Sequence, residues 1–118
     1  MTPQELREFC LSFNDVVEEF PFRPETSVFK VAGKMFALTT LEAEPLTVNL
    51  KCEPEIALQL RAVHPEIVPG WHMNKRHWNT VTVDAGLPDQ QVRELIEDSY
   101  DLVVAGLPRA DRLRLDRP

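Results

Sequence analysis

The sequence predicts an α+β fold, in which a single antiparallel sheet carries helices packed on one face, in the order α-β-β-β-α-β-α. Three segments carry apolar residues at helical spacing, and four others alternate apolar with polar residues, as strands with one buried face do. The helices are therefore expected on the apolar side of the sheet. Because no repeat or linker interrupts the chain, residues 1–108 are expected to form one domain and residues 109–118 a mobile tail.

The first element is expected to be a helix that begins after Thr2. Thr2 is a good N-cap, Pro3 suits the first helical position, and Glu5 completes a capping box. Asn14-Asp15 is expected to end the helix, and Val16 to Phe22 to be irregular or briefly extended. The apolar face of the helix consists of Leu6, Phe9, Cys10 and Phe13.

A β-hairpin is expected next, formed by residues 27–32 and 35–40 around Gly33-Lys34. A two-residue loop that begins with glycine suits a tight hairpin turn. The half-polar, solvent-facing side of the hairpin is then expected to hold Val28, Lys30, Ala37 and Thr39. The core side is expected to hold Val31 opposite Phe36 and Phe29 opposite Leu38.

The second half of the chain is expected to add two strands and two helices. Residues 46–52 alternate as a strand, and Pro54 begins a helix that ends at His64 before Pro65. A last strand follows Trp78, and a last helix runs from Pro88 to Gly106. The expected inward-facing residues are Leu46, Val48, Leu50 and Cys52; Ile56, Leu60 and Val63; Val81 and Val83; and Val92, Leu95, Ile96, Ser99 and Val103.

The charge is unevenly distributed along the 118 residues, whose formal net charge is −6. Residues 1–20 carry five acids and one base, whereas residues 21–82 carry seven bases and six acids. The net charge counts against general affinity for nucleic acid, but a mildly basic face can exist in the middle of the chain. No apolar run approaches the roughly 20 residues of a membrane span, and no signal peptide is recognisable, so a cytoplasmic protein is expected. Cys10 and Cys52 lie in apolar patterns and are expected to be buried free thiols.

One stretch, Trp71–Asn79, concentrates flat rings and hydrogen-bond donors. It contains two Trp, two His, two Asn, a Lys and an Arg, without an acidic residue. Pro69-Gly70 precedes it as a turn signal, and Thr80–Val83 follows as a strand signal. Such a loop suits the recognition of an anionic, planar ligand, for which nucleic acid is the obvious candidate. The alternative is a structural loop whose two Trp cap the core.

The same stretch carries a family resemblance. Gly70–Val81 resembles the signature of the MmcQ/YjbR family, small bacterial proteins described as DNA-binding, and the similarity extends from about residue 5 to residue 108. This resemblance implies a CyaY-like fold and DNA as the partner. The other segments that resemble the family are Phe20-Pro21-Phe22, Phe29–Ala37, Val48–Cys52 with Pro54-Glu55, and Ser99–Val103.

These observations favour a non-catalytic DNA-binding protein that uses an open sheet face and the Trp71–Asn79 loop. Weak to moderate affinity is expected, with a possible protein partner and a monomer slightly favoured. Two alternatives remain: a protein-interaction module that uses the Trp71/Trp78 patch, or a small-molecule binder with a pocket near His72 and His77. The candidate nucleic-acid-binding residues are Lys30, Lys34, Asn49, Lys51, Trp71, His72, Asn74, Lys75, Arg76, His77, Trp78 and Asn79.

Other chemistries lack support in the sequence. The histidines have no neighbouring ligands at metal-site spacing, so no metal is expected. No glycine-rich phosphate loop occurs, so no nucleotide cofactor is expected. Glu94, Glu97, Asp98 and Asp101 are expected to form a solvated helix face. Tyr100 is expected to pack at the edge of the core with its hydroxyl bonded.

Overall fold

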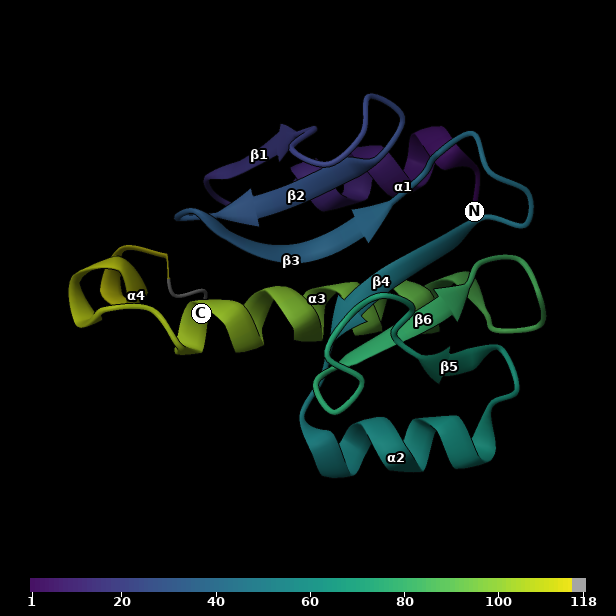
Figure 1. The fold of residues 1–118 in the computed structure, drawn as a ribbon. Coiled ribbons are helices and arrows are strands. Elements are labelled where there is room, and N and C mark those ends of the chain that lie inside the picture. Colours follow the sequence, from purple (N-terminus) through teal and green to yellow (C-terminus); the bar gives the residue numbers. More distant parts are fainter. Residues whose placement is uncertain (116–118) are drawn as a thin grey trace.

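A six-stranded antiparallel sheet with helices on one side forms the frame of the protein (Figure 1). The computed structural model describes residues 1–115 and confirms the predicted α+β fold class. The strand order is β1-β2-β3-β4-β6-β5. The elements are α1 (Pro3–Leu11), β1 (Val16–Glu19), β2 (Ser27–Val31), β3 (Lys34–Thr39), β4 (Thr47–Lys51), α2 (Pro54–Val63), β5 (Ile67–Pro69), β6 (Trp78–Thr82), α3 (Asp89–Ala105) and α4 (Arg109–Leu115).

Helix α1 starts as the sequence predicts. The hydroxyl of Thr2 accepts a hydrogen bond from the Glu5 backbone N–H at 3.1 Å, and the Glu5 carboxylate accepts one from the Thr2 N–H at 2.9 Å. This capping box is therefore confirmed. The helix ends at Leu11, slightly before the predicted stop, and buries Leu6 and Cys10 completely.

Three short elements extend the predicted order. The segment at Val16–Glu19 is the extended strand β1, paired with β2, and β5 lies where a loop is predicted. Strands of three or four residues carry too little alternation to be recognised in the sequence. The prediction of a tail is wrong for residues 109–115, which form helix α4 with Leu115 only 1% exposed. Residues 116–118 of the predicted tail lie outside the described residues.

The hairpin register differs from the prediction. Val31 pairs with Lys34, so the loop is Ala32-Gly33 rather than Gly33-Lys34. Both loop residues have positive φ, 49° and 78°, as the type I′ turn of a two-residue hairpin requires. The register also shifts between Phe29 and Lys30, where β3 has an extra residue. Phe29 therefore pairs with Ala37, which lies in the core and not on the predicted solvent side. Leu38 and Thr39 also exchange their predicted sides, with Leu38 opposite Val28 and Thr39 opposite Ser27.

The core lies between the sheet and the helices α1 and α3, which pass behind the sheet in Figure 1. Phe29 and Phe36 are both fully buried in this core. Phe13 stacks on Tyr100 with ring centroids 4.7 Å apart, and Phe36 meets Tyr100 edge-on at 5.4 Å. The Tyr100 hydroxyl donates to the Asn14 carbonyl at 2.8 Å, which confirms that this hydroxyl is bonded.

Helix α2 is the exception to this close packing. It lies beside β5, at the lower edge of the sheet in Figure 1, and only Ala57 is fully buried within it. Of the predicted inward stripe, Leu60 packs against the core, but Ile56 is 45% exposed and Val63 is 70% exposed. The predicted burial of Val63 is therefore wrong, because this helix follows the edge of the sheet instead of lying across it. No helix within residues 1–115 is long and apolar enough to cross a membrane.

Candidate functional site

The side chains that point away from the helices form the outer face of β4 and β6. Lys51 lies opposite Trp78 across this pair of strands, and Asn49 lies opposite Thr80. Their neighbours Leu50 and Val81 point to the core, as the alternation of the sequence predicts. The side of these two strands that faces away from α3 therefore combines a half-buried lysine with a half-buried tryptophan.

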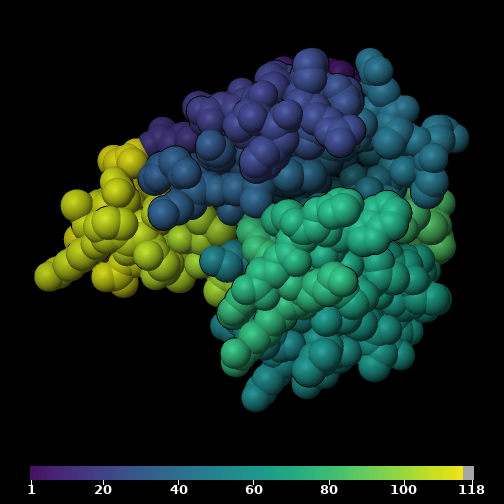
Figure 2. Space-filling view, viewed as in Figure 1, coloured from purple at the N-terminus to yellow at the C-terminus, as the bar shows by residue number. Residues whose placement is uncertain are grey.

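The loop from Gly70 to His77 is fastened to this outer face. The Gly70 N–H donates to the Trp78 carbonyl at 2.8 Å, and the Trp71 N–H donates to the Thr80 hydroxyl at 3.1 Å. That hydroxyl donates in turn to the Asn49 amide oxygen at 2.6 Å. Glycine is required at position 70, because a Cβ atom there would lie 2.8 Å from the Trp78 Cβ. In Figure 2 the loop forms a green ridge beside the blue surface of β2 and β3.

Arg61 of α2 holds the loop from the other side. Its Nε donates to the Asn79 amide oxygen at 2.6 Å, and its Nη2 donates to the Trp78 carbonyl at 3.2 Å and to the Lys75 carbonyl. A planar guanidinium can satisfy several acceptors at once, which a lysine cannot do in the same way. Sequence reasoning missed this role. The available signal was that Arg61 is the single basic residue of this helix.

Held in this way, the loop presents its charged and aromatic groups to solvent. Trp71 is 75% exposed, and its ring centroid lies 6.0 Å from that of His72, which is also exposed. Asn74, Lys75 and Arg76 are exposed as well. The Asn74 amide oxygen accepts from the Arg76 N–H at 3.0 Å and closes a local turn, so this side chain shapes the loop.

The cations of the outer face differ in their electrostatic partners. Within residues 1–115, Lys51, Lys75 and Arg76 form no ion pair. Lys30, in contrast, pairs with Glu19 at 2.9 Å. Lys34 is exposed at the start of β3, outside the strand pair that carries the loop. The structure therefore brings together Lys51, the loop residues and Trp78, and it leaves Lys30 and Lys34 on neighbouring strands.

Two of the predicted site residues are engaged inside the protein. Asn49 is 8% exposed and bonds Thr80, and Asn79 is 2% exposed and bonds Arg61. His77 is half-buried, and its carbonyl accepts from the Cys52 N–H at 2.8 Å. These residues position the loop and the strands beneath it.

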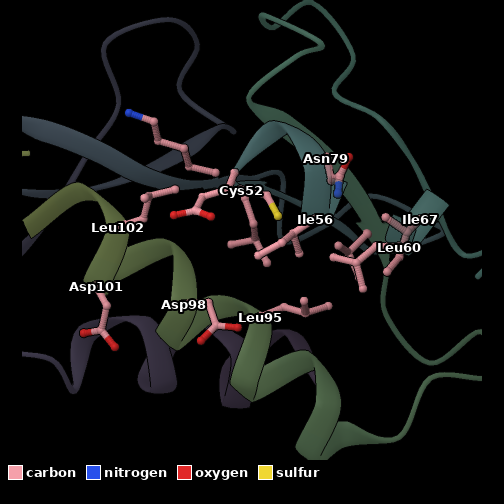
Figure 3. A pocket seen from close by; sticks show the side chains of 13 residues that line it. Cys52, Ile56, Leu60, Ile67, Asn79, Leu95, Asp98, Asp101 and Leu102 are labelled. Carbon is pink, nitrogen blue, oxygen red and sulfur yellow. The ribbon is translucent and has the colours of Figure 1, made fainter. Parts of the chain in front are cut away.

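A pocket of about 400 Å³ lies on the opposite side of the sheet, between α2 and α3 (Figure 3). Its wall is mainly apolar, and none of the three histidines belongs to its lining, so this pocket is not the one predicted near His72 and His77. Cys52, predicted to be buried, is half-buried at this pocket, whereas Cys10 is completely buried as predicted. Both are free thiols.

Comparisons with known proteins agree on one family. The model of the family YjbR matches residues 11–102. The chain is 42% identical over 97 residues to the uncharacterized protein YbdF of Escherichia coli O157:H7, covering 81% of this chain and 79% of that protein. It is 34% identical over 112 residues to the uncharacterized protein YjbR of Escherichia coli strain K12, covering 95% of each chain.

Solved structures show the same similarity. The crystal structure of a Deinococcus radiodurans protein with the domain DUF419 has a TM-score of 0.90 and 42% identity, covering 99% of this chain and 89% of that chain. A crystal structure from Pseudomonas syringae has a TM-score of 0.75 and 31% identity, covering 86% of this chain and 98% of that chain. The fold described above is therefore shared with proteins of clearly related sequence.

Proposed function

The chain belongs to the YjbR family, and from that premise we propose that it is a non-catalytic DNA-binding protein that uses the outer face of β4 and β6 and the Trp71–Asn79 loop. The observation that carries this proposal is that Lys51, Lys75 and Arg76, cations without an ion pair within residues 1–115, belong to the same loop and strand pair as the exposed ring of Trp71. Cations of this kind bind phosphate groups, and exposed rings stack on bases.

The geometry favours single-stranded over double-stranded DNA. Trp71, with 75% of its surface exposed, can stack on an unpaired base, whereas the bases of a duplex are stacked on one another. Three cations can neutralise only a few phosphates, so binding is expected to be weak to moderate. For a single strand, neutralising about three phosphates gives a slope of about −2 in a plot of log K against log salt concentration.

The binding experiment compares two double variants with the same change of charge. Fluorescence anisotropy with a labelled single-stranded oligonucleotide and its duplex, at low salt, measures the affinity of each variant. Lys75→Ala with Arg76→Ala is expected to weaken binding by about 2 kcal/mol, since lost phosphate contacts cost roughly 1 kcal/mol or more each. The control, Arg109→Ala with Arg112→Ala, removes two exposed arginines of α4 and is expected to leave binding nearly unchanged.

Two results would contradict the proposal at different levels. If the wild-type protein binds neither oligonucleotide at low salt, it is not a DNA-binding protein of this kind. If both double variants weaken binding equally, only overall charge matters and the Trp71–Asn79 loop is not the contact site.

A protein partner is the second candidate for the same surface. Val68, 46% exposed, lies opposite Thr80 on β6, and Thr80 bonds the backbone of the exposed Trp71. An exposed aromatic ring on the same surface as an exposed aliphatic side chain is also typical of protein interfaces. If the wild-type protein is folded and monomeric but binds no DNA, this second function is favoured.

A further inference from the structure

The pocket between α2 and α3 exists because α2 stands away from the rest of the helical layer. Its floor is made by core-facing residues of the sheet, among them Leu50 and Val81. Ile56 and Leu60 of α2 form one wall, and Leu95 of α3 forms the other, around the space shown in Figure 3. Ile56 remains 45% exposed there although its neighbour Ala57 is fully buried.

The size and lining of this pocket are those of a ligand site. Its volume, about 400 Å³, lies within the range of roughly 300–1,000 Å³ that small-molecule sites occupy. An apolar wall with a few polar groups at one side is the usual design of such sites. The apolar side chains here gain from being covered, because each square ångström removed from water contributes about 25 cal/mol.

The polar part of the lining is mainly acidic. Glu53, Asp98 and Asp101 contribute three carboxylates, against the single base Lys51, whose side chain alternates toward the outer face of β4. Partial desolvation raises the pKa of the Asp98 carboxyl, although the residue as a whole is exposed, and the neighbouring charges of Asp101, Glu97 and Glu94 raise this pKa further. A positive charge at Asp98 would relieve this repulsion, and a negative charge would increase it.

We propose that this pocket binds an amphipathic organic cation, whose aliphatic or aromatic body lies between Ile56, Leu60 and Leu95 and whose ammonium group contacts Asp98. The site lies on the helix side of the sheet, and the proposed DNA contacts lie on the outer face. Lys51 and Asn79 border both regions, but Asp98 and the apolar side chains of Ile56, Leu60 and Leu95 have no part in the proposed DNA contacts, so each proposal can fail without the other.

The test uses three probes with the same body and different charge: 4-phenylbutylamine, 4-phenyl-1-butanol and 4-phenylbutyrate. Methyl-detected NMR titrations at neutral pH measure the affinity of each probe and locate it through the signals of Ile56, Leu60 and Leu95. The amine is expected to bind about fivefold more tightly than the alcohol, as a partly exposed ion pair allows, and the carboxylate to bind most weakly.

Two variants of one exposed residue make the test specific. Asp98→Asn is expected to abolish the advantage of the amine over the alcohol, and Asp98→Lys to make the carboxylate the best probe. Asp98 is exposed, so both variants are expected to fold. The control Glu42→Gln removes an exposed carboxylate that is not part of the pocket lining and should leave the order of the probes unchanged.

Three outcomes would overturn the proposal. Equal affinity for the three probes would show an apolar groove without selectivity for charge. Shifts confined to residues outside the pocket lining would place the probes elsewhere. A third outcome is that the methyl signals of the pocket do not shift with any probe but do shift on dilution, and that sedimentation shows a dimer. This result would show that a second copy of the chain covers this surface.

Discussion

The hydroxyl of Ser99 donates a hydrogen bond to the backbone carbonyl of Phe36 at a distance of 2.6 Å. The same hydroxyl accepts from the Lys51 N–H at 2.8 Å, so a side chain of α3 joins β3 to β4. The backbones of the two strands pair through Ala37 with Leu50 and Leu38 with Asn49, and the Thr39 hydroxyl donates to the Thr47 carbonyl at 2.6 Å. Ser99 therefore satisfies two backbone groups where the ladder between the two halves of the sheet ends.

We expect Ser99→Ala to lower the free energy of unfolding by about 1–3 kcal/mol, because it leaves the buried Phe36 carbonyl and the partly buried Lys51 N–H without their partner. Urea denaturation measures this change. Ser12→Ala is the control, since the Ser12 hydroxyl also donates to a backbone carbonyl, at 2.6 Å from that of Phe9, but lies at the surface. Equal effects of the two substitutions would show that Ser99 has no special role between the strands.

Helix α4 gives a test of the C-terminal packing. Leu115 is 1% exposed and Leu113, in the same helix, is 64% exposed. Leu115→Ala is expected to lower the free energy of unfolding by about 2 kcal/mol or more, as large-to-small changes in a core do. Leu113→Ala is expected to change it by less than about 0.5 kcal/mol. A negligible effect of Leu115→Ala, measured by the same denaturation, would mean that α4 is not docked.

Arg61 is expected to control the order of the loop. Arg61→Ala leaves the Asn79 amide oxygen and the Lys75 carbonyl without their Arg61 partner and removes one of the two donors to the Trp78 carbonyl, so amide hydrogen exchange should become faster from Lys75 to Trp78. Arg93→Ala, on α3, removes an arginine that lies over the Phe9 ring and should not affect these amides. Unchanged exchange rates in Arg61→Ala would show that the bonds from Gly70 and Trp71 are sufficient to hold the loop.

The two tryptophans of the proposed DNA site are expected to behave differently. Trp71→Ala should weaken single-stranded binding by roughly 1–3 kcal/mol and duplex binding by less, because stacking needs an unpaired base. Trp78→Ala should affect binding and stability together, since this ring is half-buried. Phe22→Ala removes a 66% exposed ring on the segment between β1 and β2 and serves as the control. A Trp71→Ala variant that binds single strands as well as the wild type would exclude stacking on this ring.

The two thiols should differ in their reactivity and in its pH dependence. Burial, with a smaller contribution from Glu18, raises the pKa of the Cys10 thiol to about 12. Burial, Asp98 and Glu53 raise the pKa of Cys52 as well, but this thiol lines the pocket. Iodoacetamide reacts with the thiolate, so both should react slowly at neutral pH, and Cys52 should react first as the pH rises. Mass spectrometry of the native protein would contradict this order if Cys10 is alkylated first.

The raised pKa of Cys10 also affects stability. The folded state favours the protonated thiol of Cys10. The contribution of this thiol to the free energy of unfolding is therefore complete below the pKa that Cys10 has in the unfolded chain, and it is lost as the pH rises toward 12. Cys10→Ser is not a suitable comparison, because it buries a hydroxyl. Cys10→Ala should remove this part of the alkaline loss of stability, although the smaller side chain lowers stability at neutral pH.

The sequence predicted those features that depend on neighbouring residues or on simple alternation. The capping box of Thr2 and Glu5 is local, and the inward directions of Val48, Leu50, Val81 and Val83 follow from alternation. The hairpin loop was misplaced because Ala32 adopts a positive φ that alanine rarely takes, so residue type gave no sign of it. A turn that depends on an unusual backbone conformation of one residue, such as Ala32, is therefore not predicted by the pattern of apolar and polar residues.

The candidate site was predictable only in part, for a related reason. The composition of Trp71–Asn79 identified the exposed rings and cations, since an acid-free loop after a turn signal is visible in the sequence. The bond from Arg61 to Asn79 joins residues 18 apart, and the pocket depends on the distance between two helices. Neither leaves a periodic trace, so only the three-dimensional structure could show them.

The two edges of the sheet have a consequence for the behaviour of the protein at high concentration. β5 has three residues and ends in Pro69, which has no N–H to offer, and β1 has four residues, the last two being Glu18 and Glu19. Fibrous aggregation by edge-to-edge pairing needs a long, flat strand with free backbone groups. The edge strand β5 is short and contains a proline, and the edge strand β1 is short and acidic. Neither strand offers the long row of free backbone groups that a growing fibril would pair with, so the folded chain should resist this route to aggregation.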